Sequence, residues 1–507
     1  MDVSLSNRSE TKDAPAGRNT RKIAILGGGI AGLSAAWALE KARRAGEPIE
    51  YSVYEAADRL GGVISSEVID GCVVEGGPDS FLTEKPAAAE LCRELGIADQ
   101  LLGSNDAERK TYILVGRRLI PLPDGLMFMV PTKLVPTALT PLFSWSTKLH
   151  MAREFLFPPQ PAREDESVAD MTRRHFGQQI VDRLVSPLLS GVYGGNASQL
   201  SVRAVLPRMV SMEQKHRSLS RGMLAARRNV IPAAGKGRAP RSLFTTLRGG
   251  MSQMANAIAR ELQPGSLHLS TPVRALRHNS EDCPSPRPDC KFSCGWTLET
   301  APGTEKFDGV ILALPAWAAG GLLRRVDRLL GDVLAEIPYS SSITVTLGFP
   351  MERLRSLPPG FGYLVPATER RAMLACTFVH AKFAGRTPPD KGVLRCFLGG
   401  AGNDALLDEP DDRITEKVLR ELAEILHVTG QPDFVRITRS RRAMAQYSVG
   451  HLERMQYVRE SIAAMPSLAL AGNAYEGIGV PDCIRTGQHA AETVLKSVRQ
   501  QPVGEPC

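Results

Sequence analysis

The stretch KIAILGGGIAGLSAAWAL, which spans Lys22–Leu39, decides the fold. Its first five residues predict a short buried strand, and the residues after the glycines predict a helix through Ala45. In such a strand, turn and helix, Gly27 makes the tight turn and Gly29 lets the backbone approach a pyrophosphate, while Gly32 lets the helix pack closely. The sequence therefore predicts a dinucleotide-binding turn with contacts from Gly27, Gly28, Gly29, Ile30, Ala31 and Gly32.

The segment after this turn favours FAD as the nucleotide. Ile49–Tyr54 predicts a second strand, which ends at the offset where a carboxylate accepts hydrogen bonds from both ribose hydroxyls. The RLGG sequence that follows places two more glycines where a loop can approach the same pyrophosphate from the other side. Ordinary dinucleotide dehydrogenases do not need this second pair, so it favours FAD over NAD. The predicted contacts here are Glu55, Ala56, Arg59, Gly61 and Gly62.

A second glycine-rich crossing lies near the end of the chain. Leu468–Ala471 predicts an apolar strand, Gly472–Gly479 a turn, and Val480–Val494 a helix. Backbone N–H groups at such a helix N-terminus can point at the pyrimidine edge of a flavin and stabilise its anionic reduced ring. The alternative is a plain strand and helix that close the fold. We count Gly472 among the predicted cofactor contacts.

The rest of the chain predicts further units, as expected for 507 residues. Strands are expected at Thr271–Leu276, Gly309–Pro315, Ser340–Phe349 and Val393–Gly399, and helices over most of 121–241. We predict an α/β protein with a Rossmann-type FAD-binding domain built from discontinuous segments, a mixed-sheet substrate domain and a helical insertion. The expected bounds are a disordered leader at 1–20, FAD-binding segments at 21–104, 242–317 and 437–498, a helical substrate-entrance or membrane-facing region at 105–241, and a substrate-binding domain at 318–436.

Composition is typical of a globular cytoplasmic protein. Hydrophobic residues make up 43% and charged residues 23% of the chain, and no apolar run is long enough to span a membrane. The polar N-terminus carries no secretory signal. Nine cysteines are too few for a disulfide scaffold, and Cys283, Cys290 and Cys294 lack the spacing of a metal site, so no metal is predicted. We expect no nucleic-acid partner and consider a homodimer.

Two stretches in the middle have unusual side chains. The stretch from Arg203 to Arg248 contains eleven Lys or Arg residues and one acid, Glu213. It should therefore bind an anion, contact a phospholipid surface or simply be exposed to solvent. Pro121–Pro159 is rich in apolar and aromatic residues and has few acids. It is expected to be pocket or core, with peripheral membrane contact at the inner face of the cell membrane as the alternative.

From Arg21 to Val498 the chain resembles the porphyrinogen oxidases of haem synthesis, the protoporphyrinogen or coproporphyrinogen III oxidases within the amine-oxidase-like flavoproteins. The glycine fingerprint and RLGG belong to the whole superfamily. More specific are EGGPDSFL at Glu75–Leu82, QYSVGH at Gln446–His451 and AGNAYEGIGVPDCIRTG at Ala471–Gly487. Further matches are SGVYGG at 190–195 with Leu200 and Ser201, RGGM at 248–251 and ALP at 313–315.

The resemblance implies an enzyme with bound FAD. Its substrate would be a small-molecule porphyrinogen, oxidised to the porphyrin in three two-electron steps, with molecular oxygen as acceptor and hydrogen peroxide as product. The reaction requires no general base, so none of the nine histidines is assigned a catalytic role. For His451 we expect a structural hydrogen bond. Matching positions imply cofactor contacts from Gly77, Pro78, Asp79, Ser80, Val273, Val480, Asp482, Cys483 and Ile484, and substrate contacts from Lys85, Tyr193 and Arg248.

Three departures from the family pattern leave the substrate open. Many members have an Arg close after the GP pair that meets a substrate propionate, but here the segment 79–85 has none, and Lys85 is the residue that could take its role less rigidly. Asn196 stands where an Asp is common, and Ser440 or Arg441 where a Trp often precedes QY. Lys85 and the overall likeness favour coproporphyrinogen III, with four propionates, over protoporphyrinogen IX, with two. The alternatives are a flavin amine oxidase or carotenoid desaturase, and a non-catalytic flavoprotein that binds a tetrapyrrole.

Overall fold

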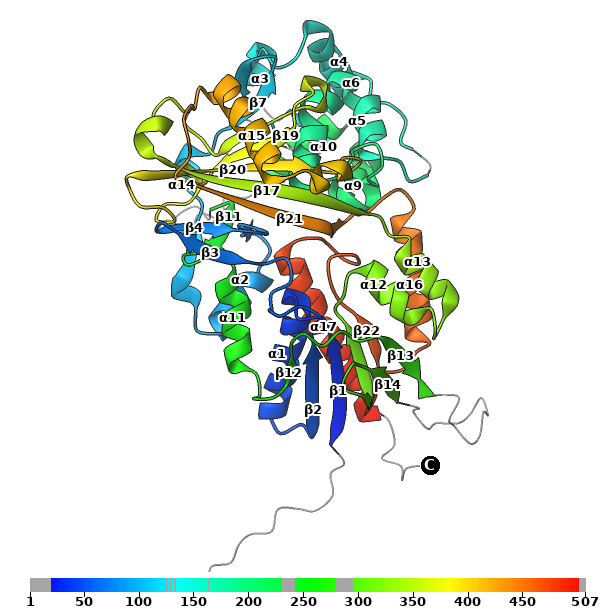
Figure 1. Cartoon of the computed structure of the whole chain (residues 1–507). Coiled ribbons are helices and arrows are strands. Elements are labelled where there is room, and N and C mark those ends of the chain that lie inside the picture. The colour runs from blue at the N-terminus through cyan, green and yellow to red at the C-terminus, as the bar shows by residue number, and fades with distance from the viewer. Residues whose placement is uncertain are drawn as a thin grey trace, which may run out of the picture.

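A parallel sheet forms the core of the lower layer of the molecule (Figure 1). The computed structural model describes residues 20–123, 126–127, 130–131, 134–162, 164–229, 242–279 and 295–500. The strand order is β12–β2–β1–β16–β22, and all neighbours are parallel. The strands are β12 (Leu267–His268), β2 (Ile49–Tyr54), β1 (Arg21–Leu26), β16 (Gly309–Leu312) and β22 (Leu468–Leu470). The leader at 1–19 and Cys283, Cys290 and Cys294 lie outside the described residues.

Both faces of this sheet are covered, which explains why its central strands are continuously apolar. Ile23 and Ile25 pack in one cluster with helices α1 (Ile30–Arg44), α11 (Ser252–Glu261) and α17 (Val480–Gln500). Ala24 and Leu26 point the other way, towards a three-stranded antiparallel sheet. That sheet consists of β13 (Ala275–His278), β14 (Trp296–Glu299) and β15 (Thr304–Phe307). The arrangement is a Rossmann-type unit assembled from distant segments.

A seven-stranded mixed sheet crosses above this layer, with the long strands β17 and β21 nearest to it (Figure 1). All its pairs are antiparallel except β18 with β7. Helix α15 (Asp411–Leu426) packs its apolar side chains against one face. The strands in order are β21 (Phe434–Ala445), β17 (Tyr339–Pro350), β20 (Lys391–Gly399), β19 (Met373–Phe378), β18 (Gly362–Leu364), β7 (Thr111–Val115) and β8 (Arg118–Pro121).

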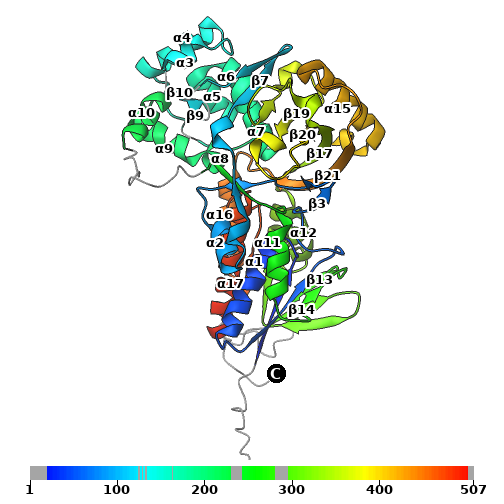
Figure 2. The same cartoon turned by 90° about the vertical axis from the view of Figure 1, so that its left-hand side faces the viewer.

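A group of helices lies beside this sheet at the top of the molecule (Figure 2). They are α3 (Leu134–Leu139), α4 (Trp145–Leu156), α5 (Val168–Phe176), α6 (Gln178–Ile180), α7 (Ser186–Tyr193), α8 (Val202–Val205), α9 (Pro207–His216) and α10 (Leu219–Asn229). The structure therefore has the predicted helical insertion, although β7 and β8, within 105–241, join the mixed sheet. A short hairpin, β9 (Leu126–Met127) with β10 (Val130–Pro131), precedes the helices.

The remaining elements are short strands and helices. They are β3 (Ser66–Ile69), β4 (Cys72–Glu75), β5 (Phe81–Leu82), β6 (Leu101–Gly103) and β11 (Phe244–Leu247), with helices α2 (Ala87–Glu94), α12 (Ala316–Leu323), α13 (Arg328–Ala335), α14 (Val379–Lys382) and α16 (His451–Ala463). The strand expected at Thr271–Leu276 begins only at Ala275, because Thr271 donates its N–H to Glu55 O instead of to a strand ladder. Among the described helices, none is both long and apolar enough to cross a membrane.

Candidate functional site: a glycine-lined nucleotide cleft

Two glycines of the first turn are required by backbone packing. Gly27 has a φ of +107°, and a Cβ there would lie 2.4 Å from the carbonyl oxygen of Ala313. A Cβ on Gly32 would lie 1.9 Å from the carbonyl oxygen of Gly27. Any larger residue at either position would force the turn, helix α1 and strand β16 apart. The roles predicted for these glycines, turn and close packing, agree with this geometry.

Gly29 differs, because open space lies in front of it. A Cβ there would meet only the Cα of Gly62, at 4.0 Å. Helix α1 starts at Ile30, and no side chain caps its N-terminus, so its first N–H groups have no side-chain acceptor. Gly61 and Gly62, both with positive φ, close the other side, and Gly29 forms a parallel bridge with Gly61. Free donors, a helix dipole and space for a ligand fit the pyrophosphate of FAD.

Glu55 lies directly beside this turn. Its carboxylate accepts the N–H of Gly28 at 2.6 Å and the N–H of Ala57 at 2.8 Å. Glu55 therefore holds the loop together, and its contact with a ribose stays a prediction, as does that of exposed Ala56. Arg59 donates to the carbonyl oxygens of Leu60, Gly62 and Ile64, which fixes the shape of the RLGG loop.

The segment that leads to Val273 runs along Glu55. Ser270 donates its N–H to Ala57 O, and Thr271 donates its N–H to Glu55 O, both at 2.8 Å. Val273 is half-buried against the core two residues further on. This position is compatible with the predicted contact to the adenine side, which stays a prediction.

The C-terminal crossing brings a second helix N-terminus to the same place. A Cβ on Gly487 of α17 would lie 2.1 Å from the carbonyl oxygen of Ala31, so the early turns of α17 and α1 touch. Gly472 has a φ of +130°, and its N–H donates to Thr486 Oγ1 at 3.2 Å. Because α17 begins at Val480, its unpaired N–H groups and those of α1 lie on neighbouring helices. Both helices follow strands of the same parallel sheet, so their positive N-termini lie at the same edge of that sheet.

Asp482, in the first turn of α17, is already engaged. Its carboxylate accepts the Nζ of Lys85 at 2.6 Å and the N–H of Gly479 at 3.1 Å. Lys85 therefore already pairs with Asp482, and its side chain, which is 42% exposed, could still reach a substrate. Burial raises the pKa of the neighbouring Cys483 to about 12, and that of Tyr193 to about 12 as well. Both groups stay protonated at neutral pH. Buried Ile484 packs in the core of the same helix.

The segment Gly77–Ser80 lies under the mixed sheet and is surrounded by buried charges. Asp79 accepts the Nζ of Lys382 at 3.0 Å, and its carboxylate lies 3.9 Å from the guanidinium of Arg395. Burial opposes ionisation, yet the charges of Lys382 and Arg395 hold the pKa of Asp79 well below its usual range. Next to them Glu75 accepts Arg386 at 2.6 Å. We name Glu75, Asp79, Lys382, Arg386 and Arg395 the sheet cluster.

Sequence reasoning missed the three cations of the sheet cluster. Their signal was present, because Arg395 interrupts the apolar run GVLRCFLGG, and a charge inside a buried strand needs a partner. The partner, however, is more than three hundred positions away in the sequence. Pro78, between Gly77 and Asp79, is half-buried.

Other predicted residues lie away from the cleft or behave differently. Arg248 is exposed at the end of β11, near Gly385, and is not brought together with Lys85 and Asp482. The prediction of a structural hydrogen bond for His451 is wrong, because neither ring nitrogen has a partner among the described residues. The imidazole ring instead stacks on the Tyr447 ring, with 4.1 Å between the ring centroids. Burial lowers the pKa of His451 to about 4, so it is neutral.

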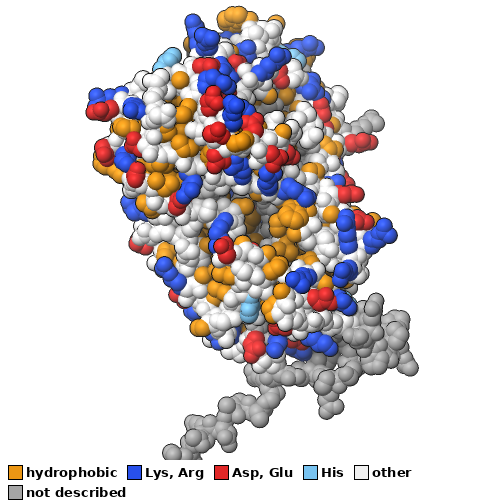
Figure 3. Space-filling model, viewed as in Figure 1, with side chains coloured by type: hydrophobic (Ala, Val, Ile, Leu, Met, Phe, Trp, Pro, Cys, Tyr) orange, Lys and Arg blue, Asp and Glu red, His pale blue; other side chains and the backbone are white. Residues whose placement is uncertain are grey.

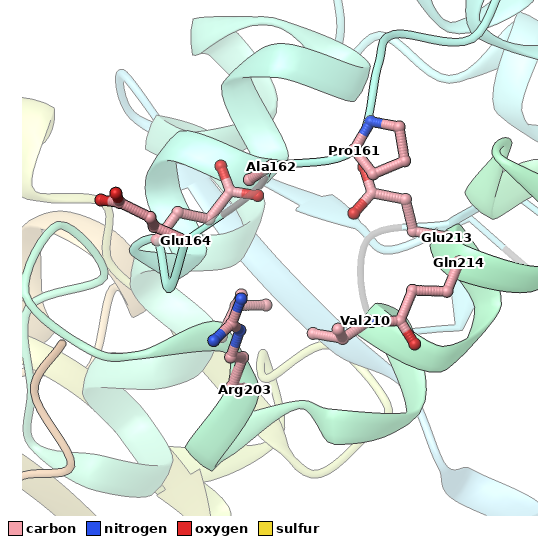
Figure 4. A pocket seen from close by; sticks show the side chains of 9 residues that line it. Pro161, Ala162, Glu164, Arg203, Val210, Glu213 and Gln214 are labelled. Atoms are coloured by element: carbon pink, nitrogen blue, oxygen red, sulfur yellow. The ribbon is translucent and has the colours of Figure 1, made fainter. Parts of the chain in front are cut away.

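The helical region contains a second group of buried and half-buried charges, beside a small pocket (Figure 4). His175 contacts Glu154 at 3.0 Å and Glu213 at 2.8 Å. Arg174 pairs with Glu213 and Glu166. We name Glu154, Glu166, Arg174, His175 and Glu213 the helix cluster. Figure 4 shows Glu213 and Glu164 on the cavity wall, and Arg203 below them.

Parts of the basic and apolar stretches are described. Lys236, Arg238 and Arg241 lie outside the described residues, as do Phe128 and Met129. On α4, Trp145, Leu149 and Leu156 are exposed and share one helix face, which favours surface contact over core for this helix. In the part of the chain that the structure describes, no group of His, Cys, Asp or Glu can hold a metal ion.

Known proteins match this chain over almost its whole length. The flavin containing amine oxidoreductase family matches residues 30–495. The coproporphyrinogen III oxidase of Bacillus subtilis (strain 168) is 34% identical over 481 residues, which cover 94% of this chain and 98% of the relative. That of Propionibacterium freudenreichii subsp. freudenreichii is 32% identical over 499 residues, covering 93% and 90%. A crystal structure of an Exiguobacterium sp. 255-15 protein, described as a candidate protoporphyrinogen oxidase, has a TM-score of 0.82 and 31% identity, covering 95% and 100%.

The family match and the geometry of the cleft agree on the cofactor. Open space at Gly29, two adjacent helix N-termini and the RLGG loop fit FAD, and the matched family is flavin-containing. The chain belongs to the porphyrinogen oxidases of the flavin-containing amine oxidoreductase family and is an FAD-dependent oxidoreductase.

Proposed function

We propose that this enzyme oxidises coproporphyrinogen III to coproporphyrin III in haem biosynthesis, with molecular oxygen as acceptor. The observation that carries the proposal is the end-to-end match with the Bacillus subtilis coproporphyrinogen III oxidase, at 34% identity over 94% of this chain. Each of three two-electron steps would consume one oxygen molecule and release one hydrogen peroxide. Protoporphyrinogen IX is the competing substrate, because the Exiguobacterium relative is described as a candidate protoporphyrinogen oxidase.

The residues near the cleft support a reaction without a strong base. FAD, when bound, supplies the two-electron acceptor. Burial raises the pKa values of Tyr193 and Tyr339 to about 12, so these two hydroxyls keep their protons near neutral pH and would form an inert wall beside the substrate. A porphyrinogen can lose its pyrrole protons by tautomerisation, so such a wall needs only to hold the ring and exclude water.

Anaerobic reduction of the purified protein's flavin tests this proposal. The protein is mixed with coproporphyrinogen III and, in a parallel sample, with protoporphyrinogen IX, and the flavin absorbance is followed before air is admitted. We expect faster bleaching with coproporphyrinogen III, then porphyrin fluorescence and peroxide after air. Faster bleaching with protoporphyrinogen IX would reverse the substrate assignment. No bleaching by either would favour an amine oxidase or a non-catalytic flavoprotein.

We also propose that α4 is the element that contacts a membrane surface. Trp145, Leu149 and Leu156 are 77%, 72% and 61% exposed, and Lys148 Nζ lies 4.4 Å from the centroid of the Trp145 ring. An apolar stripe with an adjacent cation suits an anionic lipid surface. Co-sedimentation with phosphatidylglycerol vesicles should fall for Trp145→Ser; equal sedimentation would contradict this contact. The cytoplasmic location and a homodimer stay predictions.

A further inference from the structure

Strand β21 carries four arginines, and one of them has no carboxylate partner. Arg442 forms no ion pair within the described part of the chain, whereas its three neighbours do. Its guanidinium instead lies 4.7 Å from the centroid of the Trp317 ring. Stacking on an indole leaves the N–H donors of a guanidinium free to bind a ligand. The three paired arginines are Arg436 with Glu67, Arg439 with Asp411 and Arg441 with Asp408.

The backbone at Arg442 has an uncommon conformation for an L-residue. Its φ is +45°, in the left-handed region that costs free energy for most side chains. The register between β17 and β21 shifts at this point, between Ser340 and Ser342, and the Arg442 N–H donates to Ser341 Oγ at 3.1 Å. Bulges of this kind redirect a side chain, and they occur often beside active sites. The fold therefore accepts local strain to aim Arg442 out of the sheet.

The redirected strand leads straight to the flavin side of the cleft. Ala443, the next residue, accepts the Nδ2 of Asn473 at 2.9 Å, and Asn473 belongs to the glycine-rich crossing before α17. Two residues later Ala445 pairs with Tyr339 at the start of β17. Arg442 is thus the residue directly before the contact between β21 and the crossing that leads into α17.

An aromatic wall lies next to Arg442. Tyr339 accepts the N–H of Ala316 at 2.8 Å, next to Trp317. Burial raises the pKa of Tyr339, and the nearby positive charge of Arg442 opposes that rise. The hydroxyl of Tyr475 and the indole N–H of Trp317 are buried without a partner among the described residues. Figure 3 shows apolar side chains gathered around a hollow near the middle of this face. Ring surface for a flat macrocycle therefore lies beside a cation, Arg442, that has no carboxylate partner in the described part of the chain.

We propose that Arg442 binds a carboxylate of the substrate and sets the orientation of the macrocycle on the wall formed by Trp317 and Tyr339. This inference rests on the proposed function, since it requires a substrate with peripheral carboxylates. A guanidinium binds a carboxylate through two parallel hydrogen bonds, whereas Lys85 offers a point charge that Asp482 already shares. Arg442 is then a specificity-determining residue, and a ring with four propionates has more ways to engage it than one with two.

Arg442→Asn is the variant that tests this role. Asparagine tolerates a positive φ better than most residues, so the variant removes the charge without adding backbone strain. Arg441→Asn is the matched control, because Arg441 is the adjacent residue and pairs with Asp408 outside the cleft. Binding of the product, coproporphyrin III, is measured from the shift of its Soret band, and turnover of coproporphyrinogen III is measured from porphyrin fluorescence.

We expect Arg442→Asn to raise both the Kd for coproporphyrin III and the KM for coproporphyrinogen III about tenfold, which corresponds to ~1.4 kcal/mol. The value of kcat should change less than twofold, and Arg441→Asn should behave as wild type. The tetramethyl ester of coproporphyrin, which has no carboxylates, should bind both variants and wild type equally. Arg442→Lys should recover part of the affinity.

The outcomes separate this inference from the proposed function. If wild-type flavin is not reduced by coproporphyrinogen III, the proposed function fails and the inference falls with it. If wild type turns over and Arg442→Asn keeps the wild-type Kd and KM, the inference is overturned while the proposed function stands. Equal weakening of acid and ester binding would also overturn it, because the lost contact would then not involve a carboxylate.

Discussion

The helix cluster and the sheet cluster are both buried groups of five charged side chains, yet they carry opposite excess charge. The helix cluster sets three carboxylates against two cations when His175 is protonated, which leaves one negative charge in excess. The sheet cluster sets two carboxylates against three cations, which leaves one positive charge in excess. Only the sheet cluster borders the segment Gly77–Ser80, so the positive excess lies on the side of the molecule where an anionic cofactor is expected.

The clusters also differ in how completely their hydrogen bonds are formed. Both ring nitrogens of His175 have carboxylate partners, and Glu154 additionally accepts the N–H of Leu219 at 2.7 Å. In the sheet cluster the Nε atoms of Arg386 and Arg395 and the Nη1 of Arg386 are buried and have no partner among the described residues, whereas in the helix cluster only the Nε of Arg174 lacks one there. A buried network with partners on both sides of its central residue is expected to hold helices together. A buried network that keeps unpartnered N–H donors beside a cleft is expected to influence a bound ligand as well.

The largest effect should come from breaking the buried pair of the sheet cluster. Arg386→Met leaves Glu75 as an uncompensated buried carboxylate, because the Arg386 side chain is fully buried and Glu75 nearly so. We expect the free energy of unfolding to fall by ~3–5 kcal/mol. Urea unfolding at saturating FAD measures it. The control is Arg499→Met, whose exposed pair with Glu47 should contribute less than about 1 kcal/mol. Similar losses for both variants would show that Glu75 and Arg386 are not energetically coupled.

A smaller effect with a defined pH dependence is expected from the helix cluster. Burial lowers the pKa of His175, but the hydrogen bonds and charges of Glu154 and Glu213 raise it above 6.5 overall. A raised folded-state pKa contributes stability that is complete below pH 6.5 and is lost as the pH rises through the folded pKa. Burial raises the pKa values of Glu154 and Glu213, but hydrogen bonds with His175 and other neighbours lower them overall. The stability that these two carboxylates contribute is therefore complete above pH 4.5 and is lost as the pH falls through their folded-state pKa values.

His175→Gln should therefore lower the free energy of unfolding by ~2 kcal/mol near pH 6, since it removes hydrogen bonds to charged groups. The difference in the free energy of unfolding between the variant and wild type should become smaller as the pH rises, because wild-type His175 loses its proton. Urea unfolding from pH 5.5 to 9 measures this gap. A gap that widens with pH would mean that His175 is neutral in the folded protein.

Local sequence patterns predicted the elements that carry the FAD-binding turn. Strand β1, helix α1 and strand β2 each depend on a short run of residues whose apolar spacing and glycines leave few alternatives. Strands β17 and β20 were also visible, β17 from its β-branched residues and β20 from an apolar run that Arg395 interrupts. Glu55 was found because its distance from the glycines is fixed by the intervening helix.

Contacts between distant segments could not be predicted in the same way. Nothing near Asp79 in the sequence indicates that Lys382 and Arg395 will surround it, because their positions depend on how the mixed sheet lies over the cleft. The parallel pairing of β7 with β18 has the same origin, and it places residues 111–121 in a sheet. The conformation of Arg442 depends on a bulge that only the β17–β21 register reveals.

The smallest expected effect concerns the potential of the flavin. Lys382→Met removes the cation that pairs with Asp79 at 3.0 Å and cancels the positive excess of the sheet cluster. Because reduction adds negative charge to the flavin, a less positive surrounding should lower its midpoint potential, by about 30 mV if the change is ~1.4 kcal/mol for two electrons. A dye-coupled reductive titration measures it. Lys391→Met is the control. Lys391, the first residue of β20, pairs with Asp70, and its replacement should leave the potential unchanged. A potential that rises or stays constant in Lys382→Met would mean that the sheet cluster, like the helix cluster, serves stability alone.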